Sequence, residues 1–318
     1  MPRDLQERGG ADVIRAGVIG VGKLGRYHAQ KYAAIDGVEL AGVYDLDRER
    51  ADQVAREFGT RSYPSLGRLL RDVDLVSIAV PTVDHYEVAK RCLRAGKHVL
   101  IEKPLTETVT QARKLINLAR EKGLVLQVGH VERFNPALKR VATYVRNPGF
   151  IEAERISPFP ERGTDVDVIL DLMIHDLDLI LHFVKSPVKR VHAVGVPVLS
   201  EKVDIANARI LFESGCVANV TASRASMKVS RKIRIFQEDG YFSIDFVEKN
   251  IKVVRMSIDP TSGKKSLSGE LLKTEEGDPL LDEIKSFIES VRSGKEPEVT
   301  GLDGLRALEV AFQVRKKI

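Results

Sequence analysis

Cysteine, tryptophan and long apolar runs are scarce or missing in this chain of 318 residues. The two cysteines, Cys92 and Cys216, lie far apart and show no CxxC spacing, so they predict neither a metal site nor a disulfide framework. No apolar run approaches the roughly 18 residues that cross a bilayer, and residues 1–12 are charged and contain glycine, unlike a signal peptide. We therefore expect a cytoplasmic protein with no metal and no membrane contact.

A large excess of one charge is also missing. The 50 Lys and Arg residues are interleaved with 45 Asp and Glu residues, and no long basic block appears. This pattern argues against nucleic acid, whereas the small net charge of +5 suits an anionic ligand. With 43% apolar residues, the chain exceeds the roughly 250 to 300 residues at which single cores stop growing, so two domains are expected.

A glycine-rich turn follows the first apolar run, residues 13–19, and leads into a helical pattern that continues to Ala34. Its three glycines have the GxGxxG spacing of a dinucleotide site. The first glycine permits a tight turn, the second a close approach of the pyrophosphate, and the third close packing of helix on strand, while the N–H groups at the helix start attract phosphate. The cofactor-binding residues predicted here are Gly20, Gly22, Lys23, Leu24 and Gly25.

The next apolar run, residues 38–44, ends at Asp45, twenty residues past the last of these glycines. A carboxylate there can bond the adenosine ribose and repel a 2′-phosphate, which predicts NAD rather than NADP. Arg48 and Arg50 lie close enough to weaken this preference. The alternative is an ordinary glycine turn beside a solvated aspartate.

Short apolar runs alternate with helical patterns along this part of the chain, which is typical of βαβ units. We expect an α/β Rossmann domain with a parallel sheet over residues 12–128, with its ligand at the carboxyl ends of the strands. The expected strands are residues 13–19, 38–44, 75–80, 98–101 and 124–128.

Two of these strand ends carry further candidates. Pro81 and Thr82 open a helix that contains His85, so Thr82 is either a helix N-cap or part of a loop that touches the cofactor ribose or base; we count all three residues as cofactor-binding. His28, on the first helix, is expected to be a packing or surface residue.

The run Glu102-Lys103-Pro104 follows another strand and reaches the same sheet edge as the glycine turn. Pro104 fixes the chain there, with a cis bond as one option. Glu102 and Lys103 are counted as cofactor-binding, and the Lys103 ammonium beside a bound cofactor can exchange a proton with a substrate hydroxyl. The alternative is a salt bridge between neighbouring charges at a strand end.

The segment from residue 129 to 136 is expected to join two domains. Asn135 before Pro136 has the pattern of a helix N-cap followed by a proline in the first turn. Binding sites concentrate between domains, so Arg133 and Asn135 are also candidate substrate contacts.

A helix is expected from Asp171 to about Phe183, and it places Asp171, His175 and Asp178 at i, i+4 and i+7. A carboxylate one turn from an imidazole can orient it and raise its basicity, so His175 is the candidate general base with Asp171 behind it. Both are also counted as substrate-binding. The alternative is a surface ion pair on a helix face.

Beyond Pro187 the pattern changes to alternating strands separated by hairpin-type turns. We expect an antiparallel sheet with helices on one face and an open apolar face that packs against a second copy, as a homodimer or homotetramer. Two helices, residues 278–291 and 302–317, should close the chain. The expected strands are residues 188–198, 206–212, 216–222, 230–236, 241–244 and 251–254.

The glycine turn, Asp45, the run AGKHVLIEKP ending at Pro104 and the run DLMIHDLD from residue 171 to 178 together resemble the Gfo/Idh/MocA oxidoreductase family. The resemblance covers nearly the whole chain beyond residue 12. It implies a Rossmann domain, an α+β domain with a large, mostly antiparallel sheet over residues 129–318, and reversible hydride transfer at a sugar or cyclitol carbon. One departure is Met173, where the family often has glycine.

Within the family, the runs at residues 129–136 and 171–178 are most similar to UDP-N-acetylglucosamine 3-dehydrogenases. The chain is thus expected to oxidise a nucleotide-sugar ring hydroxyl with NAD, and either His175 or Lys103 takes the proton. Two alternatives stay open: a dehydrogenase of a free sugar or inositol, and a dinucleotide-sensing regulator without turnover.

Overall fold

The computed structural model describes residues 13–159, 166–259, 261, 263–274 and 276–318. The chain divides into two compact units. Unit 1 comprises the chain up to Val131 together with Leu280–Leu305, and unit 2 comprises Glu132–Pro279 and Arg306–Ile318. The sequence had suggested a single boundary after residue 128, so the return of Leu280–Leu305 to unit 1 differs from that expectation.

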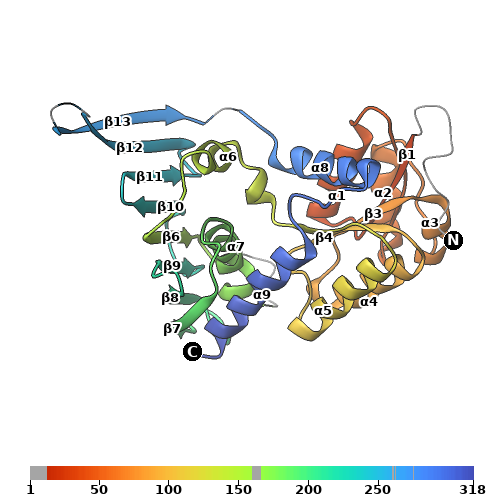
Figure 1. Ribbon diagram of the computed structural model, residues 1–318. Helices are drawn as coiled ribbons and strands as arrows, with labels where there is room; N and C mark the ends of the chain where they lie inside the picture. Colours follow the sequence, from red (N-terminus) through yellow and green to blue (C-terminus); the bar gives the residue numbers. More distant parts are fainter. Residues whose placement is uncertain (1–12, 160–165, 260, 262, 275) are drawn as a thin grey trace. The chain divides into compact units, whose positions relative to one another are not determined.

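Unit 1 contains a parallel five-stranded sheet in the order β2-β1-β3-β4-β5, as expected for a Rossmann domain. Helices α1 and α8 lie on one face and α4 and α5 on the other (Figure 1). The strands are β1 (Ile14–Ile19), β2 (Val38–Tyr44), β3 (Leu75–Ile78), β4 (His98–Glu102) and β5 (Leu126–Gly129). The helices are α1 (Lys23–Ala33), α2 (Arg48–Glu57), α3 (Leu66–Asp72), α4 (Thr82–Arg94), α5 (Val109–Glu121) and α8 (Pro279–Ser293).

Local capping explains several helix starts in unit 1. The Asp47 carboxylate accepts the Arg50 N–H at the start of α2, and Thr108 and Gln111 form a capping box at the start of α5. The prediction of Thr82 as an N-cap is wrong. Pro81 has the extended backbone of the cap position (ψ 147°), so Thr82 is already the first helical residue and no side chain caps α4.

The return of α8 to unit 1 follows from its apolar face. Ile284, Phe287, Ile288 and Val291 are buried in the same cluster as residues of β1, α1 and β2. Farther on, the Val128 N–H donates to the Val299 carbonyl at 3.2 Å, so the chain after α8 also borders β5. Burial of these side chains stabilises unit 1 by about 1.5 to 3 kcal/mol each, so unit 1 is incomplete without the returning segment.

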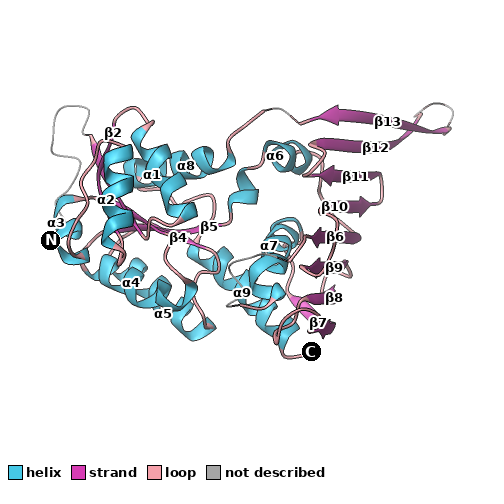
Figure 2. Ribbon diagram, turned by 180° about the vertical axis from the view of Figure 1, so that it is seen from behind, coloured by secondary structure: helices cyan, strands magenta, loops and turns pink. Residues whose placement is uncertain are grey.

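Unit 2 contains an eight-stranded, mostly antiparallel sheet in the order β13-β12-β11-β10-β6-β9-β8-β7, in which β6 and β9 are parallel. Helices α6, α7 and α9 cover one face (Figures 1 and 2). The strands are β6 (Phe150–Ile156), β7 (Val188–Val196), β8 (Ile205–Phe212), β9 (Val217–Ser223), β10 (Ser230–Gln237), β11 (Gly240–Asp245), β12 (Asn250–Ile258) and β13 (Lys265–Lys273). The helical segments are the 3-10 turn η2 (Val131–Phe134), α6 (Pro136–Ala142), the π-helical turn η3 (Ile169–Met173), α7 (Ile174–Phe183) and α9 (Gly301–Arg315).

The opposite face of this sheet is not uniformly apolar, contrary to expectation. Ion pairs cross its middle, with Arg234 Nη2 at 2.9 Å from Glu152 Oε2 and Lys232 Nζ at 3.0 Å from Asp245 Oδ2. The reason is strand alternation: the apolar residues of the central strands point toward the helices, and their polar neighbours point away. Exposed apolar side chains lie instead toward the two edges of the sheet: Val194, Val196 and Ile205 on β7 and β8, and Leu267 and Leu271 on β13.

Candidate active site

The glycine turn has the geometry that a dinucleotide site requires. Gly20 has a positive φ of 80°, and a Cβ on it would lie 2.8 Å from the Ala79 carbonyl oxygen. A Cβ on Gly25 would overlap the Gly20 carbonyl, so Gly25 allows α1 to start against the turn. A Cβ on Gly22 would meet nothing within 4 Å, which leaves the space that an approaching pyrophosphate needs.

The start of α1 fits an anion. Gly22 is its N-cap and provides no side-chain hydrogen bond, so the first N–H groups of the helix are not satisfied by a cap. Lys23 and Leu24, the first two helical residues, are exposed. The described turn therefore accommodates the phosphates of a dinucleotide.

Asp45 lies beside this turn, directly after β2. Its Oδ2 accepts the Val21 N–H at 2.7 Å and its Oδ1 accepts the Asp47 N–H at 2.9 Å. These two bonds orient the carboxylate at the carboxyl end of β2, where a ribose would bind. Arg50 Nη1 is 3.6 Å from Oδ2, so the neighbouring basic side chain that sequence reasoning noted does reach this carboxylate.

His85 joins two loops at the edge of the sheet in unit 1. Its Nδ1 is 2.8 Å from the Pro104 carbonyl oxygen and its Nε2 is 3.0 Å from the Val80 carbonyl oxygen. The ring is 1% exposed, and this burial lowers the pKa of His85. The structure thus places His85 between the loops, while Pro81 is exposed and Thr82 half-buried.

Glu102 is the last residue of β4 and Lys103 follows it, with a cis peptide bond between Lys103 and Pro104. Glu102 is buried: its Oε1 is 2.9 Å from His28 Nε2, and its Oε2 accepts the Lys103 N–H at 3.3 Å. A Cβ on Gly129 would lie 3.0 Å from the Glu102 carboxyl, so glycine at the end of β5 makes room for this side chain. Lys103 itself is half-buried at the strand end. His28 is a buried packing residue, but one with polar partners that sequence reasoning did not identify.

Arg133 in unit 2 is buried and is held by Asp178. Its Nε and Nη2 donate to the two carboxylate oxygens of Asp178 at 2.7 and 2.9 Å. This bidentate pair connects η2 to α7 and directs the guanidinium to a protein partner. Asn135 is the N-cap of α6, as predicted, and its Oδ1 accepts the Ala137 N–H at 3.0 Å.

The π-helical turn η3 changes the geometry expected around His175. Asp171 lies in η3 and His175 in the first turn of α7, and both are half-buried. Asp178 is 1% exposed and bonds Arg133, so it does not share an accessible face with the other two. π-Helical turns occur frequently at functional sites, so this turn favours a functional role for Asp171 and His175.

A second buried ion pair in unit 2 was missed by sequence reasoning. Arg155 Nε and Nη2 each donate at 3.0 Å to Asp176, and Arg155 Nη1 donates at 3.1 Å to Glu132. These bonds tie β6, α7 and η2 together beside His175. No local spacing could have identified them, since the partners lie 21 and 23 residues apart.

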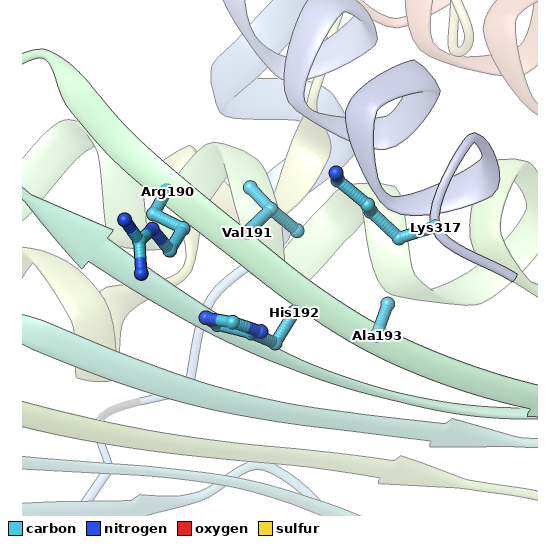
Figure 3. A pocket seen from close by; sticks show the side chains of 5 residues that line it. All are labelled: Arg190, Val191, His192, Ala193 and Lys317. Carbon is cyan, nitrogen blue, oxygen red and sulfur yellow. The ribbon is translucent and has the colours of Figure 1, made fainter.

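A surface cavity of about 340 Å³ lies at the edge of unit 2 (Figure 3). It contains none of the predicted site residues; its lining is Arg190, Val191, His192, Ala193 and Lys317. Within the described ranges, no three His, Cys, Asp or Glu side chains are grouped as a metal site. No described helix is long and apolar enough to cross a membrane.

Comparisons with known proteins agree with this geometry. Residues 14–130 match the model of an oxidoreductase family with an NAD-binding Rossmann fold, and residues 143–243 match the GFO/IDH/MocA C-terminal domain. The UDP-N-acetylglucosamine 3-dehydrogenase of Acidithiobacillus ferrooxidans is 43% identical over 307 residues, which cover 95% of this chain and 96% of that one. A solved structure of that enzyme has a TM-score of 0.90 and 42% identity, covering 96% of this chain and 97% of the other.

Two inositol enzymes are more distant. The myo-inositol 2-dehydrogenase of Thermotoga maritima is 28% identical over 324 residues, with 96% of each chain covered. The scyllo-inositol dehydrogenase of Lactobacillus casei, solved with bound NAD(H) and scyllo-inositol, is 21% identical with a TM-score of 0.79, covers 96% of this chain and 97% of its own, and shares the fold. The first family match spans the sheet of unit 1, and the second spans most of the sheet of unit 2. The chain accordingly belongs to the Gfo/Idh/MocA family of oxidoreductases.

Proposed function

We propose that this dehydrogenase oxidises a ring hydroxyl of a nucleotide sugar, at carbon 3 of UDP-N-acetylglucosamine or a close relative. The observation that carries the proposal is the 43% identity to an enzyme of that name over 95% of the chain. The inositol dehydrogenases are matched at lower identity, so a free sugar or inositol is the second candidate.

NAD, rather than NADP, is the proposed cofactor, because Asp45 stands at the end of β2. Bound NAD supplies the acceptor for the hydride that leaves the sugar carbon. The glycine turn and the start of α1 would hold its phosphates, and Asp45 its adenosine ribose. Two buried free thiols, Cys92 and Cys216, fit a reducing cytoplasm.

Lys103 and His175 are the proposed acid and base groups. As the hydroxyl carbon loses its hydride, the hydroxyl oxygen must lose a proton, which His175 Nε2 or Lys103 Nζ accepts. Asp171 would orient His175. Arg133 is engaged by its buried ion pair with Asp178. We therefore propose that it holds η2 against α7 and does not contact a substrate phosphate directly.

The test compares Lys103→Ala and His175→Ala with two controls outside the predicted site, the half-buried Lys90→Ala in unit 1 and the exposed His192→Ala in unit 2. NAD binding is measured by calorimetry, and NAD reduction is followed with UDP-N-acetylglucosamine, free sugars and inositols. We expect each site variant to bind NAD and to lose about a hundredfold or more in turnover, as for removal of a positioned acid or base. The controls should behave as the parent does.

Two results would contradict the proposal. Full turnover in both site variants on a substrate that the parent oxidises would show that the catalytic residues are misassigned. NAD binding by the parent without turnover of any compound in the panel would favour the regulatory alternative.

A further inference from the structure

Glu283 is a completely buried acidic residue on the returning helix α8 of unit 1. Its side chain is 0% exposed, and neither carboxyl oxygen has a hydrogen-bond partner. The nearby Gln127 donates through Nε2 to the Glu283 main-chain carbonyl at 3.0 Å, while the Gln127 side-chain oxygen is buried without a partner. An ionised carboxylate at such a position would lose its hydration and gain no donor in return. The neutral carboxylic acid is therefore the form that this environment accommodates.

A buried polar chain faces Glu283 from α1, β3 and β4. Tyr32 Oη is 2.9 Å from Ser77 Oγ, Ser77 Oγ is 3.0 Å from His28 Nδ1, and His28 Nε2 is 2.9 Å from Glu102 Oε1. One arrangement of donors that these distances allow has Tyr32 donating to Ser77, Ser77 to His28, and His28 to Glu102. In that arrangement the series of hydrogen bonds ends on Glu102 Oε1.

Two titratable side chains of this hydrogen-bonded series interact electrostatically with Glu283: Tyr32 of α1 and Glu102 of β4. The other described elements of the cluster around α8 contribute apolar side chains, from β1, β2 and α2. Burial first, and the Glu102 charge second, raise the pKa of Glu283 well above its usual range. Burial is also the main cause of the raised pKa of Tyr32.

We propose that Glu283 is a positioning residue that acts in its protonated form, leaving the single negative charge of the buried cluster on Glu102, which anchors Lys103. This role depends on the proposed function of Lys103. Glu102 holds the Lys103 main-chain amide through Oε2 and His28 through Oε1. If Glu283 ionises, its charge and that of Glu102 repel each other in one dry cluster. The Glu102 carboxylate then shifts, which disturbs its contacts with His28 and with the Lys103 main-chain amide.

The first experiment needs no substrate. The pH dependence of urea unfolding is measured for the parent, Glu283→Gln and the control Glu289→Gln, which changes an exposed carboxylate of the same helix. Because the folded-state pKa of Glu283 is raised, its contribution to stability is complete below its unfolded pKa of about 4.3 and is lost as the pH rises toward the folded value. Relative to Glu283→Gln, the parent's unfolding constant should increase by up to about tenfold per pH unit across that interval.

Glu289→Gln should keep the parent's pH dependence. Glu283→Met, which also lacks the titrating proton but is apolar, is the second variant if the glutamine variant does not fold. Parallel pH dependence in the parent and in the Glu283 variants would overturn the proposal, because Glu283 would then titrate alike in the folded and unfolded chain.

The second experiment separates this inference from the function itself. The parent should lose kcat at alkaline pH with an unchanged KM for NAD, and Glu283→Gln should retain kcat to higher pH. If Lys103→Ala abolishes turnover while Glu283→Gln keeps the parent's alkaline limb, the function stands and the positioning role of Glu283 is overturned. If no sugar is oxidised at all, the function fails and the unfolding data still decide the protonation of Glu283.

Discussion

The negative charge of Asp45 is expected to decide which dinucleotide binds. In Asp45→Asn, an amide oxygen can still accept the Val21 N–H, while the charge that would repel a 2′-phosphate is lost. A like-charge contact costs several kcal/mol, so the ratio of NAD to NADP affinity should fall by about tenfold or more. Arg50 then loses its contact with Asp45 and keeps only its exposed pair with Asp47 as competition for the phosphate. Calorimetry with both dinucleotides measures the ratio.

Asp47→Asn is the matched control for this change. Asp47 caps α2, and asparagine is an equally good cap, so this variant should keep both the helix and the parent's preference. Tighter binding of NADP than of NAD by the parent, or an unchanged ratio in Asp45→Asn, would contradict the assignment.

At the scale of single residues, sequence reasoning succeeded where a role depends on neighbours along the chain. The spacing of Gly20, Gly22 and Gly25 prescribes a turn, and Asn135 before a proline prescribes a cap, so the backbone geometry of both could be expected. The partners of Arg133 and Glu102 could not be expected, because they come from elements 45 and 74 residues away. Only packing of those elements shows which charges are buried and paired.

At the scale of elements, the buried Arg155 and Asp176 pair is expected to contribute strongly to the stability of unit 2. Arg155 is 4% exposed, so Arg155→Met leaves the Asp176 carboxylate buried without its counter-charge. Removal of one partner of a buried pair typically costs about 3 to 5 kcal/mol of unfolding free energy. Urea unfolding followed by circular dichroism measures the loss.

Arg234→Met is the matched control, since its pair with Glu152 crosses the same sheet at half-exposed positions. Exposed pairs contribute about 0 to 1 kcal/mol, so this variant should unfold close to the parent. Equal destabilisation by the two substitutions would show that burial of Arg155 has no special cost.

Strands and helices could be predicted from the sequence where apolar residues alternate as in a strand or recur with the period of a helix. The expected and observed bounds of β2 agree, and the other expected strands shift by only a few residues. β6 and β13 were missed: β6 carries three charges in seven residues, and β13 is exposed along its length. The π-helical turn before His175 has no recognised sequence period, so the i, i+4, i+7 spacing could not anticipate the burial of Asp178.

For the molecule as a whole, we predict a homodimer or homotetramer formed through the open face of the sheet in unit 2. The support is now the exposed apolar patch of Val194, Val196 and Ile205 beside the charged centre, because apolar area of this kind commonly marks an interface. A Val194→Asp, Val196→Asp double variant should be monomeric at micromolar concentration by light scattering. Val83→Asp, an equally exposed valine on α4 of unit 1, should keep the parent's mass. A monomeric parent would contradict this prediction.

The return of Leu280–Leu305 to unit 1 also sets the order in which the protein can be completed during synthesis. Domains usually fold from the N-terminus as the chain is made, at about 5 to 20 residues per second. Here the cluster around Ile14 and Tyr32 is closed by Phe287 and Ile288 of α8. Residues 14–131 therefore leave the ribosome well before α8, and their apolar cluster stays open in the meantime. A nascent chain stalled before α8 should be an especially good chaperone client.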